Sequence, residues 1–249
     1  MAAGALNNLA GNDDNKITIA AAGAIPPLVQ LLGAASTEVQ KNAAGALRNL
    51  AGNDKNMNTI AAAGAIHPLV QLLGAASPAV QKNAAGALDN LSRGAANKIT
   101  IAAAGAIPPL VQLLGTAAPA AVQENAAGAL VNFAMNDDNQ ITIATAGAIP
   151  PLVQLLGTGF SAHVQREAAA ALNNLALNAD NQITIAAAGA IPPLGQLLRP
   201  GSDDLPKRFA AHALKVLGNN AENSASIASA SASASAGVDV LEAIKRLCI

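Results

Sequence analysis

The sequence predicts an all-α fold, a solenoid built from repeated units of three helices. The first observation is a segment, Ala-Gly-Ala-Ile-Pro-Pro-Leu or a near copy, that recurs at intervals of 41, 41, 42 and 42 residues around Gly23, Gly64, Gly105, Gly147 and Gly189. A period of about 40 residues is typical of arrays in which each unit buries its apolar face against its neighbours. The second observation is that strict two-residue alternation is absent, while Ala, Leu, Gln and Asn dominate over β-branched and aromatic residues, which argues against strands.

The first helix of a unit is predicted over residues 16–22, where Asn15 precedes an Ile- and Ala-rich run and Gly23 follows it. A glycine at this place favours the left-handed conformation that closes many helices. We expect Asp13, Asp14 and Asn15 to cap the free amide groups at the helix start, where negative charge is also favourable.

The second helix is predicted to begin at Pro26 and Pro27, because a fixed φ and a missing amide hydrogen cost least in the first turn. Apolar residues between Leu28 and Leu32 then form its buried face, and Gly33 ends it.

The third helix is predicted over residues 37–51, with Ser36 as its cap. Apolar residues follow at spacings of 4, 7, 8 and 11, which is the stripe of one buried helical face. The stripe recurs in four copies: Val39, Ala43, Ala46, Leu47 and Leu50; Val80, Ala84, Ala87, Leu88 and Leu91; Val122, Ala126, Ala129, Leu130 and Phe133; Val164, Ala168, Ala171, Leu172 and Leu175.

We predict one continuous array over residues 1–249. Residues 1–10 match the end of a truncated repeat, which suggests an excerpt of a longer protein, and residues 11–52, 53–93, 94–135, 136–177 and 178–218 form five repeats. The third helix of the fifth copy is degenerate, with Pro206, Phe209, His212 and Val216 at places that hold other residues in earlier copies. Residues 219–249 form a degenerate C-terminal capping repeat with a Ser/Ala tract, which is alternatively a mobile loop.

Charge and composition exclude several classes of partner. The chain has 14 basic and 15 acidic residues, so no global field favours nucleic acid or an anionic membrane. Apolar stretches are interrupted by Gly and Pro well short of the roughly 20 residues that a spanning helix needs, so we expect no membrane insertion. The N-terminus lacks a signal-peptide pattern and Cys248 is the only cysteine, which favours an intracellular location, cytoplasmic or nuclear.

Catalytic and cofactor sites are not indicated. His67, His163 and His212 occupy non-equivalent positions, and no His or Cys spacing suggests a metal. The Gly-rich segments lack the Gly-Lys-Ser/Thr ending of a phosphate loop. We therefore expect no enzyme activity, no metal and no cofactor.

The repeat as a whole resembles the armadillo repeat. The resemblance rests on Asn-Lys-Ile-Thr-Ile-Ala-Ala-Ala-Gly-Ala-Ile-Pro-Pro-Leu-Val-Gln-Leu-Leu at residues 15–32 and Asn-Ala-Ala-Gly-Ala-Leu-Arg-Asn-Leu at residues 42–50, and it covers almost the whole chain. It implies a right-handed superhelix. HEAT repeats, with two helices per unit, are the nearest alternative.

The resemblance also implies a binding groove. In armadillo proteins the third helices line a concave groove, and an Asn on each holds the backbone of an extended peptide. The matching residues here are Asn8, Asn49, Asn90, Asn132 and Asn174. An amide can pair with both the carbonyl and the N–H of a peptide. The alternative is that each Asn only bonds within the array and serves structure.

Four residues before each Asn, this chain has Gly4, Gly45, Gly86, Gly128 and Ala170. Importin-α-like members of the family have Trp there, so recognition of lysine-rich import signals is not expected. A helical glycine costs about 1 kcal/mol relative to alanine, so these positions indicate either tight helix packing or a ligand lying on the groove floor.

Specificity is expected from charged residues that differ between copies. Two columns contain Lys41, Lys82, Glu124 and Arg166, and Arg48, Asp89, Val131 and Asn173. With Arg93 and Glu167 they have a slight positive excess, which favours acidic partners unless the charges form only a solvated face.

Three functions follow as hypotheses. The first is a scaffold that binds an extended peptide or partner helix along the groove, with Lys41, Arg48, Lys82 and Arg166 beside the Asn ladder. The second is a spacer or an element that self-associates end to end. The third is a targeting module tethered to an enzyme. The near identity of the copies also permits a consensus-engineered origin.

Overall fold

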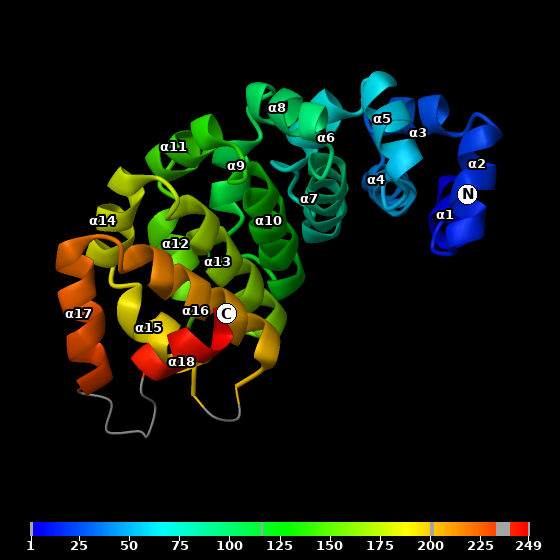
Figure 1. Ribbon diagram of the computed structural model, residues 1–249. Coiled ribbons are helices and arrows are strands. Elements are labelled where there is room, and N and C mark those ends of the chain that lie inside the picture. The colour runs from blue at the N-terminus through cyan, green and yellow to red at the C-terminus, as the bar shows by residue number, and fades with distance from the viewer. Residues whose placement is uncertain (1, 116, 200–201, 233–239, 249) are drawn as a thin grey trace. The chain divides into compact units, whose positions relative to one another are not determined.

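The structure, a computed structural model, describes residues 2–115, 117–199, 202–232 and 240–248. All its regular elements within these residues are helices, which confirms the all-α prediction. The chain forms two compact units, Met1–Phe133 and Ala134–Ile249. Figure 1 labels the helices of both units, which are described in turn.

Unit 1 contains third helices that pack side by side, each next to the third helix of the repeat before it. Short first and second helices alternate with them along the chain. The helices of unit 1 are α1 (Ala2–Leu9), α2 (Asp13–Ala21), α3 (Ile25–Leu31), α4 (Thr37–Leu50), α5 (Asp54–Ala62), α6 (Ile66–Leu72), α7 (Pro78–Ser92), α8 (Ala95–Ala103), α9 (Ile107–Gln112) and α10 (Ala120–Phe133).

Unit 2 repeats the pattern, with the third helices α13 and α16 packed against each other. Its helices are α11 (Asp137–Thr145), α12 (Ile149–Leu155), α13 (Ala162–Leu175), α14 (Ala179–Ala187), α15 (Ile191–Leu197), α16 (Asp204–Leu217), α17 (Ala221–Ala232) and α18 (Val240–Leu247). The Ser/Ala tract is therefore helical as far as Ala232. Residues 233–239 of the predicted capping repeat lie outside the described residues.

The start of the first helix differs from the prediction. Asn12, not the following Asp-Asp-Asn triplet, is the cap: its Oδ1 accepts from the backbone amides of Asp14 at 3.0 Å and Asn15 at 3.2 Å. Asp13 and Asp14 lie inside the first turn, so their carboxylates favour the positive helix end without capping it. Asn at the position before the helix has the short side chain and extended backbone that a cap needs.

The glycine after each first helix confirms the prediction. Gly23 has a φ of 76°, and its four equivalents have φ between 80° and 81°. The reversal lets the amide of Ala24 donate back to the carbonyl of Ile19 at 3.3 Å, which closes the helix and redirects the chain into α3. The first and second helices of each of the five repeats are therefore joined by the same turn.

The second and third helices form the core. Pro26 stands in the first turn of α3, as predicted, and Ile25, Leu28 and Leu32 are fully buried below it. The predicted stripe of the third helix is buried in every copy except at Val39, which is half-buried. Ser36 precedes α4 as expected, but its side chain makes no capping hydrogen bond.

Candidate peptide-binding face

The predicted ladder residues lie on third helices, one on each of α1, α4, α7, α10 and α13. Within unit 1, α1, α4, α7 and α10 are neighbours, so Asn8, Asn49, Asn90 and Asn132 lie on one layer of helices. Asn8 is exposed and the other three are half-buried. Asn174 lies on α13 of unit 2, where Asn173 Nδ2 donates to its Oδ1 at 3.2 Å.

Three ladder side chains of unit 1 bond their repeat to the one before it. The Nδ2 atoms of Asn49 and Asn90 donate to the carbonyls of Asn7 and Arg48, both at 2.9 Å. Asn132 donates to the carbonyl of Asp89 at 3.2 Å. These carbonyls belong to the preceding third helix, so the ladder has a structural role between helices.

The rungs are not equivalent. Asn49 Nδ2 also donates to Asn7 Oδ1 at 3.2 Å, and Asn132 Nδ2 to Asp89 Oδ1 at 2.9 Å, so both N–H groups of each amide are used. Asn90 makes one such bond, to Arg48, within the described part of the chain. Its second N–H and its Oδ1 therefore remain available to a ligand, which is the pair of groups that a peptide backbone needs.

A second Asn ladder, which the sequence analysis did not identify, lies on the same helices. Asn83 Nδ2 donates to the carbonyl of Lys41, and Asn125 Nδ2 to that of Lys82, both at 2.9 Å. Asn42 instead donates to Glu38 Oε1 of its own helix at 3.0 Å. The sequence does contain a sign of this ladder, a recurrent Gln-x-Asn before Ala-Ala-Gly-Ala. It does not by itself predict a hydrogen bond between repeats, because a polar residue at the edge of an apolar stripe is usually solvated.

The glycines on these helices are covered by side chains. A Cβ on Gly86 would lie 2.8 Å from Arg48 Cδ and 3.0 Å from Asn125 Nδ2, and one on Gly128 would lie 3.1 Å from Asp89 Oδ2. Arg48 and Asp89 belong to the previous repeat, where they directly precede the ladder residues Asn49 and Asn90. Asn125 belongs to the second ladder, in the next repeat. Tight helix packing, and not a ligand lying on an open groove floor, is therefore the reason for glycine at Gly86 and Gly128 that these contacts support.

Charged residues of the two predicted columns are only partly available. Lys41 Nζ is 2.6 Å from Glu38 Oε2, and hydrogen bonds from Lys41 and Asn42 hold the pKa of the Glu38 carboxyl below its ordinary value. Arg166 pairs with Glu167 beside it. Arg48 and Lys82 form no ion pair within the described residues, so they are the basic groups open to a ligand.

Arg93 does not belong with these columns. Its Nη2 lies 2.8 Å from Asp54 Oδ1 and donates to the carbonyl of Gly52 at 3.4 Å. Both acceptors lie at or just before the start of α5, a first helix. The positive excess of the face therefore depends on Arg48 and Lys82.

Arg48, Lys82, Gly86 and Asn90 form what we call the α4–α7 subsite. Lys82, Gly86 and Asn90 are four residues apart on α7 and so share one face of that helix. Arg48 of α4 covers Gly86, and its carbonyl holds Asn90 in place.

No group of three or more His, Cys, Asp or Glu side chains that could hold a metal occurs among the described residues. No helix of the described chain is both long and apolar enough to cross a membrane. His67 Nε2 lies 3.2 Å from Gln71 Nε2 at an exposed position on α6.

Comparisons with known proteins agree on one family. The profile "Armadillo/beta-catenin-like repeat" matches residues 12–52, 53–93, 94–135 and 136–177. No curated protein matches the sequence significantly.

Solved structures of engineered proteins are similar over most of the chain. A designed armadillo repeat protein, "YIII(Dq)4CqI", is 37% identical, with a TM-score of 0.80 over 87% of this chain and 92% of that one. Another engineered protein is 34% identical, with a TM-score of 0.87 over 99% of this chain and 62% of that one. A designed armadillo repeat protein in complex with the peptide (KR)4 is 35% identical, with a TM-score of 0.75 over 85% and 90%. The predicted fold class is thereby confirmed, and the chain belongs to the armadillo-repeat family.

Proposed function

We propose that this armadillo scaffold binds an extended peptide on the third-helix layer of unit 1, with the α4–α7 subsite at the centre of the contact. The observation that carries the proposal is Asn90, which is held in place by one hydrogen bond and keeps both a donor and an acceptor free. A peptide laid along the layer can use both groups whatever its side chains are.

The same subsite supports a preference for acidic peptides. Arg48 lies on the helix next to that of Asn90, and Lys82 lies about two turns before Asn90 on α7. Neither has an ionic partner in the described chain, so both can pair with a carboxylate or phosphate of the ligand. Glu124 on α10 has the opposite charge to Arg48 and Lys82, so the expected preference for acidic peptides is modest. A designed armadillo repeat protein was solved in complex with the peptide (KR)4, which supports peptide binding by this kind of scaffold but not the same charge preference.

The test uses two fluorescein-labelled octapeptides, alternating Glu-Val and alternating Lys-Val, and measures anisotropy with the full chain. We expect the Glu-Val peptide to bind more tightly, and Asn90→Ala to weaken both peptides about tenfold through loss of two peptide hydrogen bonds. Arg48→Gln with Lys82→Gln should weaken the Glu-Val peptide alone. Asn58→Ala, on the exposed face of α5, is the matched control and should leave both affinities unchanged.

Equal affinity of parent and Asn90→Ala for both peptides would contradict the proposal. That outcome would favour the second candidate, a spacer in which the ladder serves structure alone, which is supported by the fully used amides of Asn49 and Asn132. Likeness to designed proteins supports a consensus-engineered origin under either function. End-to-end self-association also stays a proposal, which concentration-dependent light scattering would test.

A further inference from the structure

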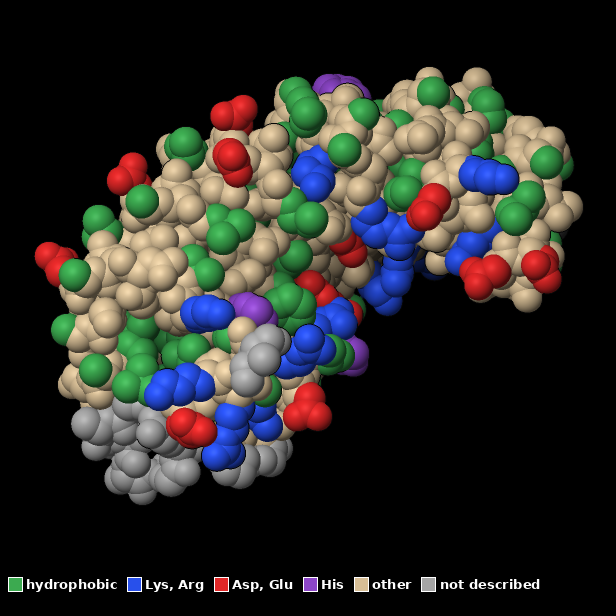
Figure 2. All heavy atoms as spheres, viewed as in Figure 1, with side chains coloured by type: hydrophobic (Ala, Val, Ile, Leu, Met, Phe, Trp, Pro, Cys, Tyr) green, Lys and Arg blue, Asp and Glu red, His purple; other side chains and the backbone are tan. Residues whose placement is uncertain are grey.

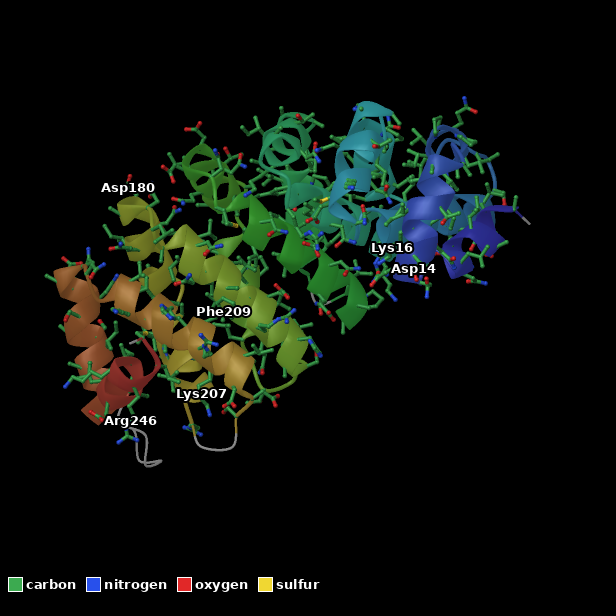
Figure 3. All side chains as sticks on the ribbon, turned by 45° about the vertical axis from the view of Figure 1, so that its right-hand side comes forward. Asp14, Lys16, Asp180, Lys207, Phe209 and Arg246 are labelled. Carbon is green, nitrogen blue, oxygen red and sulfur yellow. The ribbon has the colours of Figure 1, made fainter. Side chains whose placement is uncertain are left out.

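Three successive first helices of unit 2 carry a carboxylate at the same position. Asp138, Asp180 and Glu222 are each the second residue of α11, α14 and α17, and all three are exposed. α14 packs against both α11 and α17, so the three side chains form a row with one carboxylate per repeat. Figure 3 shows Asp180 at the outer tip of α14.

No basic residue neutralises this carboxylate row. None of the three helices contains Lys or Arg, and none of the three carboxylates forms an ion pair within the described part of unit 2. An acidic residue in the first turn stabilises a helix by itself, so the row alone does not indicate a ligand.

A parallel row of apolar residues lies three positions further on in each helix. It contains Ile141, Ile183 and Ala225, which share a helix face with the carboxylates. Ile141 and Ile183 are 55% and 53% exposed. Met135 and Leu177, which immediately precede the caps of α11 and α14, are 64% and 60% exposed. Figure 2 shows acidic and apolar side chains together along this edge.

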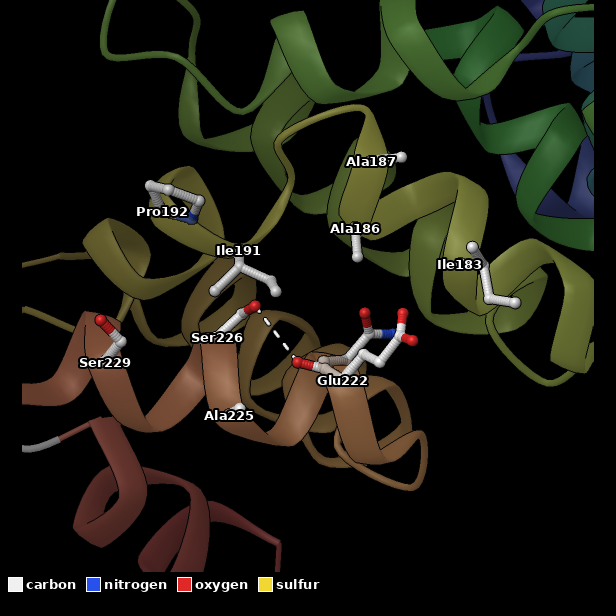
Figure 4. Close-up of a pocket in the computed structure, with 10 residues that line it drawn as sticks. Ile183, Ala186, Ala187, Ile191, Pro192, Glu222, Ala225, Ser226 and Ser229 are labelled. Atoms are coloured by element: carbon white, nitrogen blue, oxygen red, sulfur yellow. Dashed lines mark hydrogen bonds between the residues drawn. The ribbon is translucent and has the colours of Figure 1, made fainter.

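The third member of the apolar row, Ala225, lines a groove. A hollow of about 780 Å³ lies between α14, α15 and α17, and Ala225 stands where the neighbouring first helix has the larger Ile183. Ile183, Ala186, Ile191 and Pro192 form its apolar wall, as Figure 4 shows.

Two polar side chains of the groove are already hydrogen-bonded. Ser226 Oγ donates to the carbonyl of Glu222 at 3.2 Å, and Asn223 Nδ2 donates to the carbonyl of Gln182 at 3.1 Å. The Glu222 carboxylate is the charged group that lines the hollow without an ionic partner. A ligand that places an apolar side chain in the hollow and a cationic group beside Glu222 would therefore cover the apolar wall and pair with the carboxylate.

Of the three first helices of unit 1, α2 has both members of this pattern, whereas α5 and α8 do not. The carboxylate position holds Asp14, Lys55 and Ala96, and the apolar position holds Ile17, Asn58 and Ile99. Lys16, next to Asp14, pairs with Asp13 at 2.6 Å. The two parallel rows are thus a property of unit 2 and not of every first helix.

We propose that the first-helix edge of unit 2 docks a partner helix that is amphipathic and basic. The apolar stripe of that helix would cover Ile141 and Ile183 and place a side chain in the hollow at Ala225, while its Lys and Arg residues would pair with Asp138, Asp180 and Glu222. Exposed apolar area supplies affinity, and the carboxylates select the sign of the partner's charge. Interdigitation of apolar residues at helical spacing fits a surface made of helices.

The probe is a fluorescein-labelled 18-residue peptide of Leu and Lys in a helical pattern, and its control is the Leu and Glu peptide of the same pattern. Anisotropy with the full chain should show binding of the Leu/Lys peptide, weakened by salt, and much weaker binding of the Leu/Glu peptide. Ile183→Asn should weaken Leu/Lys binding about tenfold or more through loss of the central apolar contact. Asn is compatible with this position, since Asn58 occupies it in α5.

The matched control is Ile99→Asn, the same change at the equivalent exposed position of α8 in unit 1, which should alter binding less than about twofold. Asp180→Asn with Glu222→Gln should weaken binding and flatten its dependence on salt, with unchanged circular dichroism. Absence of Leu/Lys binding, equal binding of the Leu/Glu peptide, or equal losses in Ile183→Asn and Ile99→Asn would each overturn the proposal.

Discussion

Side chains of adjacent repeats decide what each helical glycine contributes. Gly4 and Gly45 are equivalent in sequence, yet a Cβ on Gly4 would meet Asn42 at an ordinary 3.5 Å, while one on Gly45 would lie 2.6 Å from Asn7 Oδ1 and 3.0 Å from Asn83 Nδ2. Both of these amides are already hydrogen-bonded to a neighbouring helix. The same residue type is therefore replaceable at one position and required at the other.

This difference predicts opposite effects of one substitution. Gly4→Ala should raise the free energy of unfolding by about 1 kcal/mol, because alanine favours a helix and the site has room. Gly45→Ala should lower it by about 1 to 2 kcal/mol, because Asn7 and Asn83 must move out of their hydrogen bonds. Urea unfolding followed by circular dichroism measures both, and stabilisation by Gly45→Ala would contradict the packing seen here.

Junctions between elements depend on a buried Asn in the first helix. Asn56 Nδ2 of α5 donates to the carbonyls of Lys16 at 3.1 Å and Leu50 at 3.2 Å, and so joins α5 to the first helix of the preceding repeat and to the end of α4. Asn181 of α14 makes the equivalent two bonds. Asn97 of α8 is similarly buried, but its Nδ2, like that of Asn139 in α11, has no partner among the described residues. The third helix before it, α7, extends one residue further, to Ser92, and Gly94 replaces the capping Asn.

Replacing these residues by leucine tests the difference between the junctions. Asn56→Leu should cost about 1 to 3 kcal/mol, because it removes the donor from two carbonyls. Asn97→Leu should be neutral or stabilising, since it removes a buried donor that has no acceptor. Thermal unfolding of the two variants provides the comparison, and a larger loss in Asn97→Leu would show that its amide has a partner in solution.

Across the whole chain, the sequence predicted the features that recur within each repeat but not the contacts that join one repeat to the next. The left-handed glycines, the prolines of the second helices and the third helix over residues 37–51 follow from local rules, and the structure places that helix at Thr37–Leu50. The Asn83 ladder, the cover over Gly86 and the unpaired Asn97 are relations between residues about 40 apart. Helical periodicity extends over one element, so it carries no information about such pairs. The cap was predicted at Asp13, Asp14 and Asn15 and lies at Asn12, because Asp and Asn both favour that position.

Because hydrogen bonds join successive repeats of unit 1, damage at one interface should remain local. Asn83→Leu removes the bond between α7 and α4, at a cost of about 1 kcal/mol. Hydrogen exchange measured by mass spectrometry should show faster exchange in α4 and α7, with α16 unchanged, as nearest-neighbour coupling requires. A uniform increase along the chain would instead indicate that the array unfolds as a single cooperative unit.

The direction of these hydrogen bonds has a consequence for the exchange of repeats. In both ladders of unit 1 the later repeat supplies the side-chain donor, and the earlier repeat supplies a backbone carbonyl, which every residue has. A repeat can therefore be followed by any repeat that carries the two Asn residues, whatever side chains the earlier repeat has. Duplication, deletion or reordering of repeats would preserve these bonds without compensating mutations, and a chain with this polarity is suited to change its length one module at a time.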